Sequence, residues 1–165
     1  MQQIIHPWPA FYTPTSKILI LGTIPSPKSR EFGFFYSHPQ NRFWKILLLL
    51  MGEETKQVTL EARQQFLVDH DIALWDVLHS CRIKGAGDSS IREPAANDFT
   101  EVLQNAPIRA IFTTGRKATQ LYEKLVYPQT RRASIYLPST SPANKCFFPD
   151  EVLLESWQII KSYLL

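Results

Sequence analysis

The chain alternates short apolar runs with longer segments in which apolar residues recur at helical spacing. Runs that suit strands buried on both faces lie at residues 17–21, 72–75, 108–113 and 134–137. Segments with helical periodicity lie at about 41–51, 59–69, 97–105, after Gly115 and from about 150 onward. Because strands alternate with helices, the pattern predicts an α/β fold: a three-layer α/β/α sandwich around a short, mainly parallel four-stranded sheet.

The remaining segments are rich in proline, glycine and polar residues. Residues 1–16 are expected to form an extended arm, and residues 82–97 a long loop. In open α/β sheets, ligands bind beyond the carboxyl ends of the strands, where the loops gather. We therefore expect a functional site among three loops with abundant side-chain chemistry, 22–42, 82–97 and 137–148.

The composition excludes some classes of protein but points to no particular chemistry. A chain of 165 residues with 44% hydrophobic and 20% charged residues is expected to form one domain, 1–165, and is neither a coiled coil nor disordered. A net charge of +3 permits a nucleic-acid partner without arguing for one. No apolar run approaches the roughly 18 residues of a membrane span, and a signal-peptide pattern is absent. We expect a cytoplasmic monomer without metal or cofactor, whose two cysteines stay reduced.

The first loop combines a glycine, hydroxyls and aromatic rings. Gly22 follows a strand and allows close approach of a ligand, and Ser26 and Ser29 are able to donate to phosphate. The segment is not a nucleotide P-loop. Residues 34–36 offer flat faces for stacking a base, with His38, Asn41 and Arg42 beside them. The structural alternative is that the aromatics are core, His38 satisfies a backbone group and Asn41 caps a helix.

The loop after the last predicted strand, LPSTSPAN at 137–144, carries hydroxyls on a proline-stiffened backbone. It suits phosphate contact or insertion into a duplex, and a rigid turn without a ligand is the alternative. A serine hydrolase would need a GxSxG elbow, which the sequence lacks.

Two further places carry candidate binding groups. Asp76, at the end of a predicted strand, either accepts a hydrogen bond from a base edge or is a buried, satisfied carboxylate. Arg116 and Lys117 follow a glycine at a predicted helix N-terminus, which is either an anion site or a cap with solvated charges. Other basic residues recur in the site loops, so one face is expected to be more positive than the net charge suggests.

Taken together, these segments resemble the uracil-DNA glycosylase superfamily, in particular its hypoxanthine-DNA (DNA-deoxyinosine) glycosylase branch. The resemblance rests on LGTIPS at 21–26, GFFYSHPQNRFW at 33–44, ALWDV at 73–77, DSSI at 88–91 and LPSTSPAN at 137–144. It spans most of the chain in order, and the HPQNRFW and LPSTSPAN strings are its specific parts. It implies a four-stranded parallel sheet between helices and removal of a damaged base that is flipped out of DNA.

The resemblance also implies roles for single residues. The first family motif falls on Gly22 to Ser26, with Thr23 inside it, and Ile24 stands where many relatives carry an Asp or Asn that serves the attacking water. The branch is thought to use the Asn of HPQNRFW, which is Asn41 here. Tyr36 stands where mismatch-specific relatives stack a phenylalanine on the base. In the second motif, Ser139 takes the backbone-pinching position, Thr140 and Ser141 adjoin it, and the wedge that fills the vacated stack comprises Pro142, Ala143, Asn144 and Lys145.

The resulting hypothesis is a monofunctional DNA glycosylase that acts on deaminated bases, with hypoxanthine favoured and uracil or a mismatch possible. Asn41 would orient water or contact the leaving base, Ser26, Ser139 and Thr140 would grip phosphates, and His38 is a further catalytic candidate without an assigned role. A lyase step through Lys28 or Lys145 stays open, because an amine could form a Schiff base. The alternatives are a catalytically silent damage- or single-strand-binding domain, favoured by Ile24, and a hydrolase of free nucleosides.

Overall fold

The computed structural model describes residues 1–53 and 58–165 and is built around a parallel sheet of four strands. The strands β2 (Ile18–Gly22), β3 (Ile72–Asp76), β6 (Ala110–Thr114) and β7 (Ser134–Leu137) lie in the order β3-β2-β6-β7. Every pair is parallel. The structure confirms the predicted sheet to within one or two residues. The strands β2, β3 and β6 are buried and contain continuous apolar stretches, whereas β7 lies at the edge of the sheet and is partly exposed.

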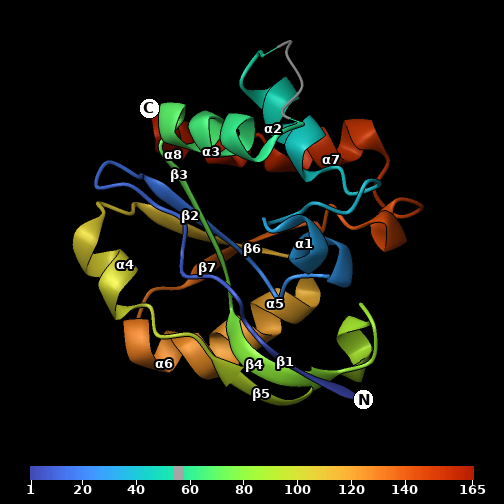
Figure 1. The fold of residues 1–165 in the computed structure, drawn as a ribbon. Coiled ribbons are helices and arrows are strands. Elements are labelled where there is room, and N and C mark those ends of the chain that lie inside the picture. Colours follow the sequence, from blue (N-terminus) through green and yellow to red (C-terminus); the bar gives the residue numbers. More distant parts are fainter. Residues whose placement is uncertain (54–57) are drawn as a thin grey trace.

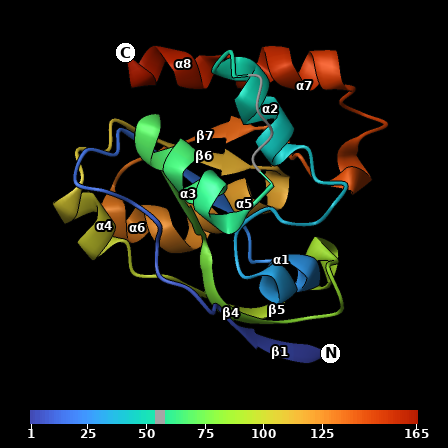
Figure 2. The same ribbon diagram turned by 45° about the horizontal axis from the view of Figure 1, so that its top comes forward.

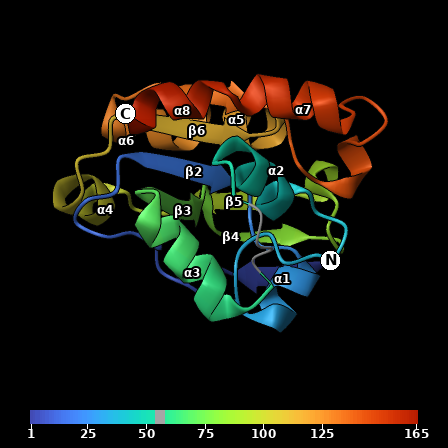
Figure 3. The same cartoon turned by 90° about the horizontal axis from the view of Figure 1, so that it is seen from above.

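Helices cover one face of this sheet, the upper one in Figure 1. They are α2 (Phe43–Leu50), α3 (Leu60–Asp69), α7 (Asp150–Trp157) and α8 (Ile159–Leu164). Alternate strand residues such as Ile18, Ile20 and Phe112 share a hydrophobic core with these helices. The predicted helix from 150 onward is two helices, and Figure 3 shows α7 and α8 following each other along the sheet.

The other face packs a second core of residues such as Leu19, Leu21 and Ile111. It is covered by α4 (Thr100–Asn105), α5 (Arg116–Leu121), a π-helical turn η2 (Tyr122–Val126) and α6 (Tyr127–Thr130). The three-layer α/β/α arrangement is therefore confirmed, with helices on both faces of the sheet (Figure 2).

A second sheet, absent from the sequence prediction, extends the lower face. The strands β1 (Gln2–Ile5), β4 (Leu78–Ile83) and β5 (Arg92–Ala96) pair antiparallel in the order β1-β4-β5. The extended arm therefore begins with a strand, and the predicted loop 82–97 is wrong at both ends. The sequence does not predict β5 in particular, because this strand is short, mostly exposed and contains Pro94.

Short helical turns fill the loops that were expected to carry the site. The helix α1 (Pro27–Phe32) lies within loop 22–42, η1 (Asp88–Ser90) within loop 82–97, and η3 (Pro142–Asn144) follows β7. Among the described residues, no helix is long and apolar enough to cross a membrane.

Candidate active site

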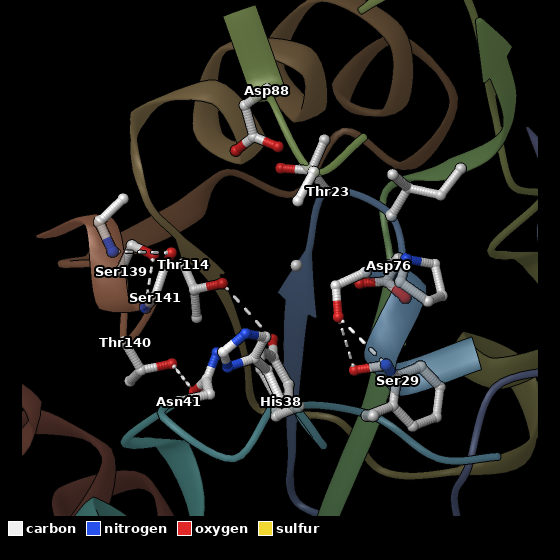
Figure 4. A pocket seen from close by; sticks show the side chains of 18 of the residues that line it. Thr23, Ser29, His38, Asn41, Asp76, Asp88, Thr114, Ser139, Thr140 and Ser141 are labelled. Carbon is white, nitrogen blue, oxygen red and sulfur yellow. Dashed lines mark hydrogen bonds between the residues drawn. The ribbon is translucent and has the colours of Figure 1, made fainter. Parts of the chain in front are cut away.

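A pocket of about 360 Å³ lies at the carboxyl ends of the parallel strands (Figure 4). All three predicted site loops contribute to it, together with the ends of β2, β3 and β6. The lining includes most candidate residues: Gly22, Thr23, Ile24, Ser26, Ser29, Tyr36, His38, Asn41, Asp76, Ser139, Thr140, Ser141, Pro142 and Ala143. The site therefore forms where an open α/β sheet places ligands, and side chains far apart in the sequence meet there.

One side of the pocket, here called the strand wall, consists of Gly22, Tyr36, Asp76 and Thr114. In this wall, the side chains of Asp76 and Tyr36 lie close to the backbone of Gly22. A Cβ at this position would lie 2.6 Å from Asp76 Oδ1 and 3.1 Å from the Tyr36 hydroxyl. The absent side chain leaves room for the Asp76 carboxylate, which is only 4% exposed. The glycine is thus required by a close contact rather than by an unusual φ angle.

The Tyr36 ring is held in one orientation. It stacks on Phe43 with ring centroids 3.8 Å apart and planes 9° from parallel, and its backbone has a φ of +55°. Its hydroxyl lies 3.4 Å from Thr114 Oγ1, which itself donates to the Leu21 carbonyl. Thr114 therefore accepts from Tyr36. Burial and the nearby Asp76 charge raise the pKa of Tyr36 far above its ordinary value, so the phenol stays neutral.

The orientation of the Asn41 amide is fixed by a backbone donor. Its Oδ1 accepts from the Phe43 backbone N–H at 2.9 Å and from the Thr140 hydroxyl at 2.7 Å. A backbone N–H only donates, so the oxygen of the amide must face it. Both bonds use the carbonyl oxygen. Within residues 1–53 and 58–165 no hydrogen bond uses the amide NH₂, which is therefore able to donate to a ligand in the pocket.

The imidazole of His38 is oriented in the same manner. The Gln40 backbone N–H donates to Nδ1 at 3.1 Å, which leaves the proton of the neutral ring on Nε2. His38 and Asn41 lie next to each other in Figure 4. The pocket therefore holds two side-chain N–H donors from the segment that precedes α2.

The opposite side is lined by residues 139–143, and the whole segment 139–148 after β7 that contains them is here called the loop wall. Ser139 Oγ accepts from the Ser141 backbone N–H at 3.1 Å, and Asn144 Nδ2 donates to the Ser139 carbonyl at 3.0 Å. Below the tip, the buried Arg42 donates to the Phe148 carbonyl at 2.6 Å and ion-pairs with Asp150. The loop is thus anchored at both ends, while Phe147 at its tip is 74% exposed.

Several of the predicted site residues make hydrogen bonds within the protein, and others do not line the pocket. Ser26 Oγ caps α1, and the buried Ser29 hydroxyl accepts from the Ser37 backbone N–H. The Thr140 side chain is buried and donates to Asn41. Asn144, Lys145, Arg116 and Lys117 are not among the described residues that line the pocket.

The pocket also contains groups that were not singled out as site residues. Asp88, on η1, faces the cavity across from Asp76 in Figure 4. Partial desolvation raises the pKa of Asp88, the Lys117 cation opposes that shift, and the Asp76 charge adds to it. Behind the wall, His6 contacts Asp76 at 2.8 Å. Sequence patterns hold no signal for His6, because it lies in a proline-rich segment 70 residues from its partner.

A solved structure shares this fold. The solution NMR structure of a Methanosarcina acetivorans protein superimposes with a TM-score of 0.79 at 29% identity, covering 97% of this chain and 99% of that one. The class is thus an α/β/α protein with its site at the carboxyl ends of a short parallel sheet.

Family-level comparison narrows the class. Residues 9–161 match the model of the uracil DNA glycosylase superfamily, and the chain belongs to that superfamily. Two curated relatives are each named hypoxanthine DNA glycosylase. The Methanosarcina acetivorans protein is 34% identical over 85% of this chain and 88% of its own. The Methanosarcina barkeri protein is 30% identical over 84% of this chain and 87% of its own.

Proposed function

We propose that this protein is a DNA glycosylase that removes hypoxanthine from DNA. The observation that supports this proposal most directly is that one pocket contains two oriented groups, the acceptor Asp76 and the donor Asn41. Hypoxanthine presents a matching edge, because N1–H donates while O6 and N7 accept. The names of the two curated relatives support the same substrate.

The reaction follows from these groups. The flipped base would stack on the face of Tyr36 that Phe43 does not cover, and Asp76 would accept from its N1–H. Cleavage of the C1′–N9 bond moves its electron pair onto the base, where the Asn41 NH₂ stabilises the developing charge. Water then adds to C1′ of the oxocarbenium-like sugar, and the proton that it loses is taken up by the departed base anion, which leaves as the neutral base. Asn41 serves the leaving base rather than the water, because its oxygen already accepts two hydrogen bonds.

Contacts to the DNA backbone are assigned to the rim. Ser139 and Ser141 line the pocket and carry hydroxyls, which suit flanking phosphates, whereas the Ser26 hydroxyl caps α1 and donates to Ser29. Arg116 and Lys117 lie outside the lining and would contact phosphates further along the strand. Buried Thr140 and Ser29 instead orient Asn41 and the α1 segment. Residues 142–145, with exposed Phe147 beyond them, would fill the vacated base stack.

The proposal includes a cytoplasmic monomer without a lyase step. One chain supplies every group that the reaction uses, and water is the nucleophile. Borohydride trapping during the reaction should give no covalent protein–DNA adduct. Gel filtration of the purified protein should give the mass of a single chain.

The test uses labelled duplexes that carry one hypoxanthine, uracil, xanthine or mismatched thymine. Alkali cleaves the abasic product, and we expect the largest signal at hypoxanthine, with free deoxyinosine untouched. Main cleavage at uracil would overturn the substrate assignment. Binding without any cleavage would favour a silent damage sensor, in keeping with Ile24, whose alkyl side chain packs partly buried against the second core and offers no acceptor.

A further inference from the structure

The pocket carboxylate Asp76 has a hidden partner from the other sheet of the molecule. His6 follows β1, and its Nε2 lies 2.8 Å from Asp76 Oδ2. Both side chains are almost completely buried, with 1% and 5% exposure. The small antiparallel sheet therefore reaches the base-binding side of the pocket through one side chain.

The proton arrangement in this pair follows from a third group. The Trp8 backbone N–H donates to His6 Nδ1 at 3.1 Å. Because Nδ1 accepts, the ring proton lies on Nε2 and is donated to Asp76 Oδ2. Asp76 Oδ2 therefore accepts a hydrogen bond from the imidazole, and one oxygen of this side chain is already engaged.

The imidazole has little freedom to turn away. Aromatic rings surround it, with centroid distances of 5.7 Å to Trp8, 6.0 Å to Phe35 and 6.4 Å to Trp75. The second carboxylate oxygen, Oδ1, faces the space left by the missing side chain of Gly22. Within the described part of the chain, no hydrogen bond reaches Oδ1, so it is available to the pocket that Asp76 lines.

We infer that His6 is a positioning residue that sets base specificity, by holding Asp76 so that its free oxygen Oδ1 is an acceptor aimed at a base N–H. This inference rests on the proposed glycosylase function. Hypoxanthine offers N1–H to Oδ1, whereas adenine and unsubstituted purine present a lone pair at N1 that the carboxylate repels. Without His6, the Asp76 side chain is free to rotate, and its Oδ1 is then no longer aimed at the base N1 position, so the site distinguishes N1–H from a bare N1 less well.

The test compares two bases that differ in this donor, hypoxanthine and unsubstituted purine, each placed in the same duplex. His6→Leu should reduce the preference for hypoxanthine over purine about 10- to 100-fold, the range of one hydrogen bond to a charged group. His6→Gln, whose amide is able to donate to Asp76, should retain most of the preference. The matched control is His79→Leu, an exposed histidine in the same small sheet.

The ratio is measured within one preparation, so an unfolded fraction cancels out. Cleavage is followed in single turnover, and binding is followed with 2′-fluoro nucleotides, which resist cleavage. Wild-type protein that prefers hypoxanthine in binding but does not cut would refute the glycosylase proposal while leaving the role of His6 measurable. Equal binding of the two bases by wild type, or an equal loss on both bases in His6→Leu, would overturn the inference.

Discussion

The two walls of the pocket differ in how their polar groups are satisfied. On the strand wall, Asp76 is paired with His6, and the Tyr36 hydroxyl is bonded to Thr114, all with little access to water. The loop wall is anchored from below, but its tip exposes Phe147. A desolvated, preorganised surface suits recognition of a base, whereas an exposed rim suits contact with a charged backbone. Asn41 joins the two walls, because Thr140 holds it.

Removal of the Asn41 side chain, which connects the two walls, should have the largest effect on excision. Asn41→Ala deletes the NH₂ donor to the leaving base, and we expect single-turnover excision of hypoxanthine to fall about 100- to 1000-fold. Asn105→Ala, which alters an exposed asparagine remote in sequence from the site loops, should leave the rate unchanged. A loss of less than tenfold in a folded Asn41→Ala protein would transfer the main catalytic role away from this residue.

The strand wall should tolerate less added volume than any part of the rim. Gly22→Ala places a methyl group 2.6 Å from Asp76 Oδ1, and Asp76 is held by His6, so one of them must move. We expect a stability loss of about 1–3 kcal/mol and at least a tenfold slower excision. Urea unfolding and single-turnover assays measure both. Gly87→Ala, whose new methyl group meets its nearest neighbour at 3.4 Å, is the control and should be near neutral.

The contrast between walls also explains what the sequence was able to predict. The parallel strands were readable, because each contains a continuous apolar run, and Gly22 at the end of β2 marked the pocket. The helix α3 was readable too, since the predicted segment 59–69 begins at its cap, Thr59, which accepts from the Ala62 backbone N–H. Local patterns of this kind encode most of the fold.

Long-range pairings were not readable. β1 pairs with β4, which lies nearly half of the chain away in sequence. Neither the alternation of apolar and polar residues nor the spacing of motifs predicts that register. The partner of Asp76 was missed for the same reason, since His6 becomes informative only once that sheet forms. The role of Asn41 as a donor likewise depends on Thr140, which belongs to a loop 99 residues away.

The exposed tip of the loop wall should matter only when the DNA is paired. Phe147→Ala removes the largest exposed apolar group of this loop, and we expect about 5- to 10-fold slower excision from duplex DNA, in line with the loss of one stacking contact. Excision from single strands should change little, because no vacated stack needs filling there. Tyr136→Ala removes another exposed aromatic, on β7, and serves as the control. Equal losses on both substrates would place Phe147 in general DNA binding instead.

The smallest effect is expected at the anchor beneath the loop wall. Hydrogen bonds from Lys45 and Arg42 hold the pKa of Asp150 below its ordinary value. A carboxyl with a lowered folded-state pKa adds stability above its unfolded pKa, and loses that contribution as the pH falls through the folded value. Asp150→Asn should therefore cost about 1 kcal/mol at neutral pH.

That cost should shrink as the pH falls below about 4, the ordinary pKa of an aspartate, where the unfolded chain begins to take up the proton, and it should vanish below the lowered pKa of the folded state. Urea unfolding of wild type and Asp150→Asn at neutral and acidic pH gives the difference directly, with Asp69→Asn as an exposed carboxylate control on α3. Asp150→Asn should slow excision by less than Phe147→Ala does, because Arg42 still donates to the Phe148 carbonyl and Asn144 still donates to the Ser139 carbonyl. A stability gap that stays constant with pH would mean that the charge of Asp150 does not fasten the loop, and that the Arg42 contact to the backbone is sufficient.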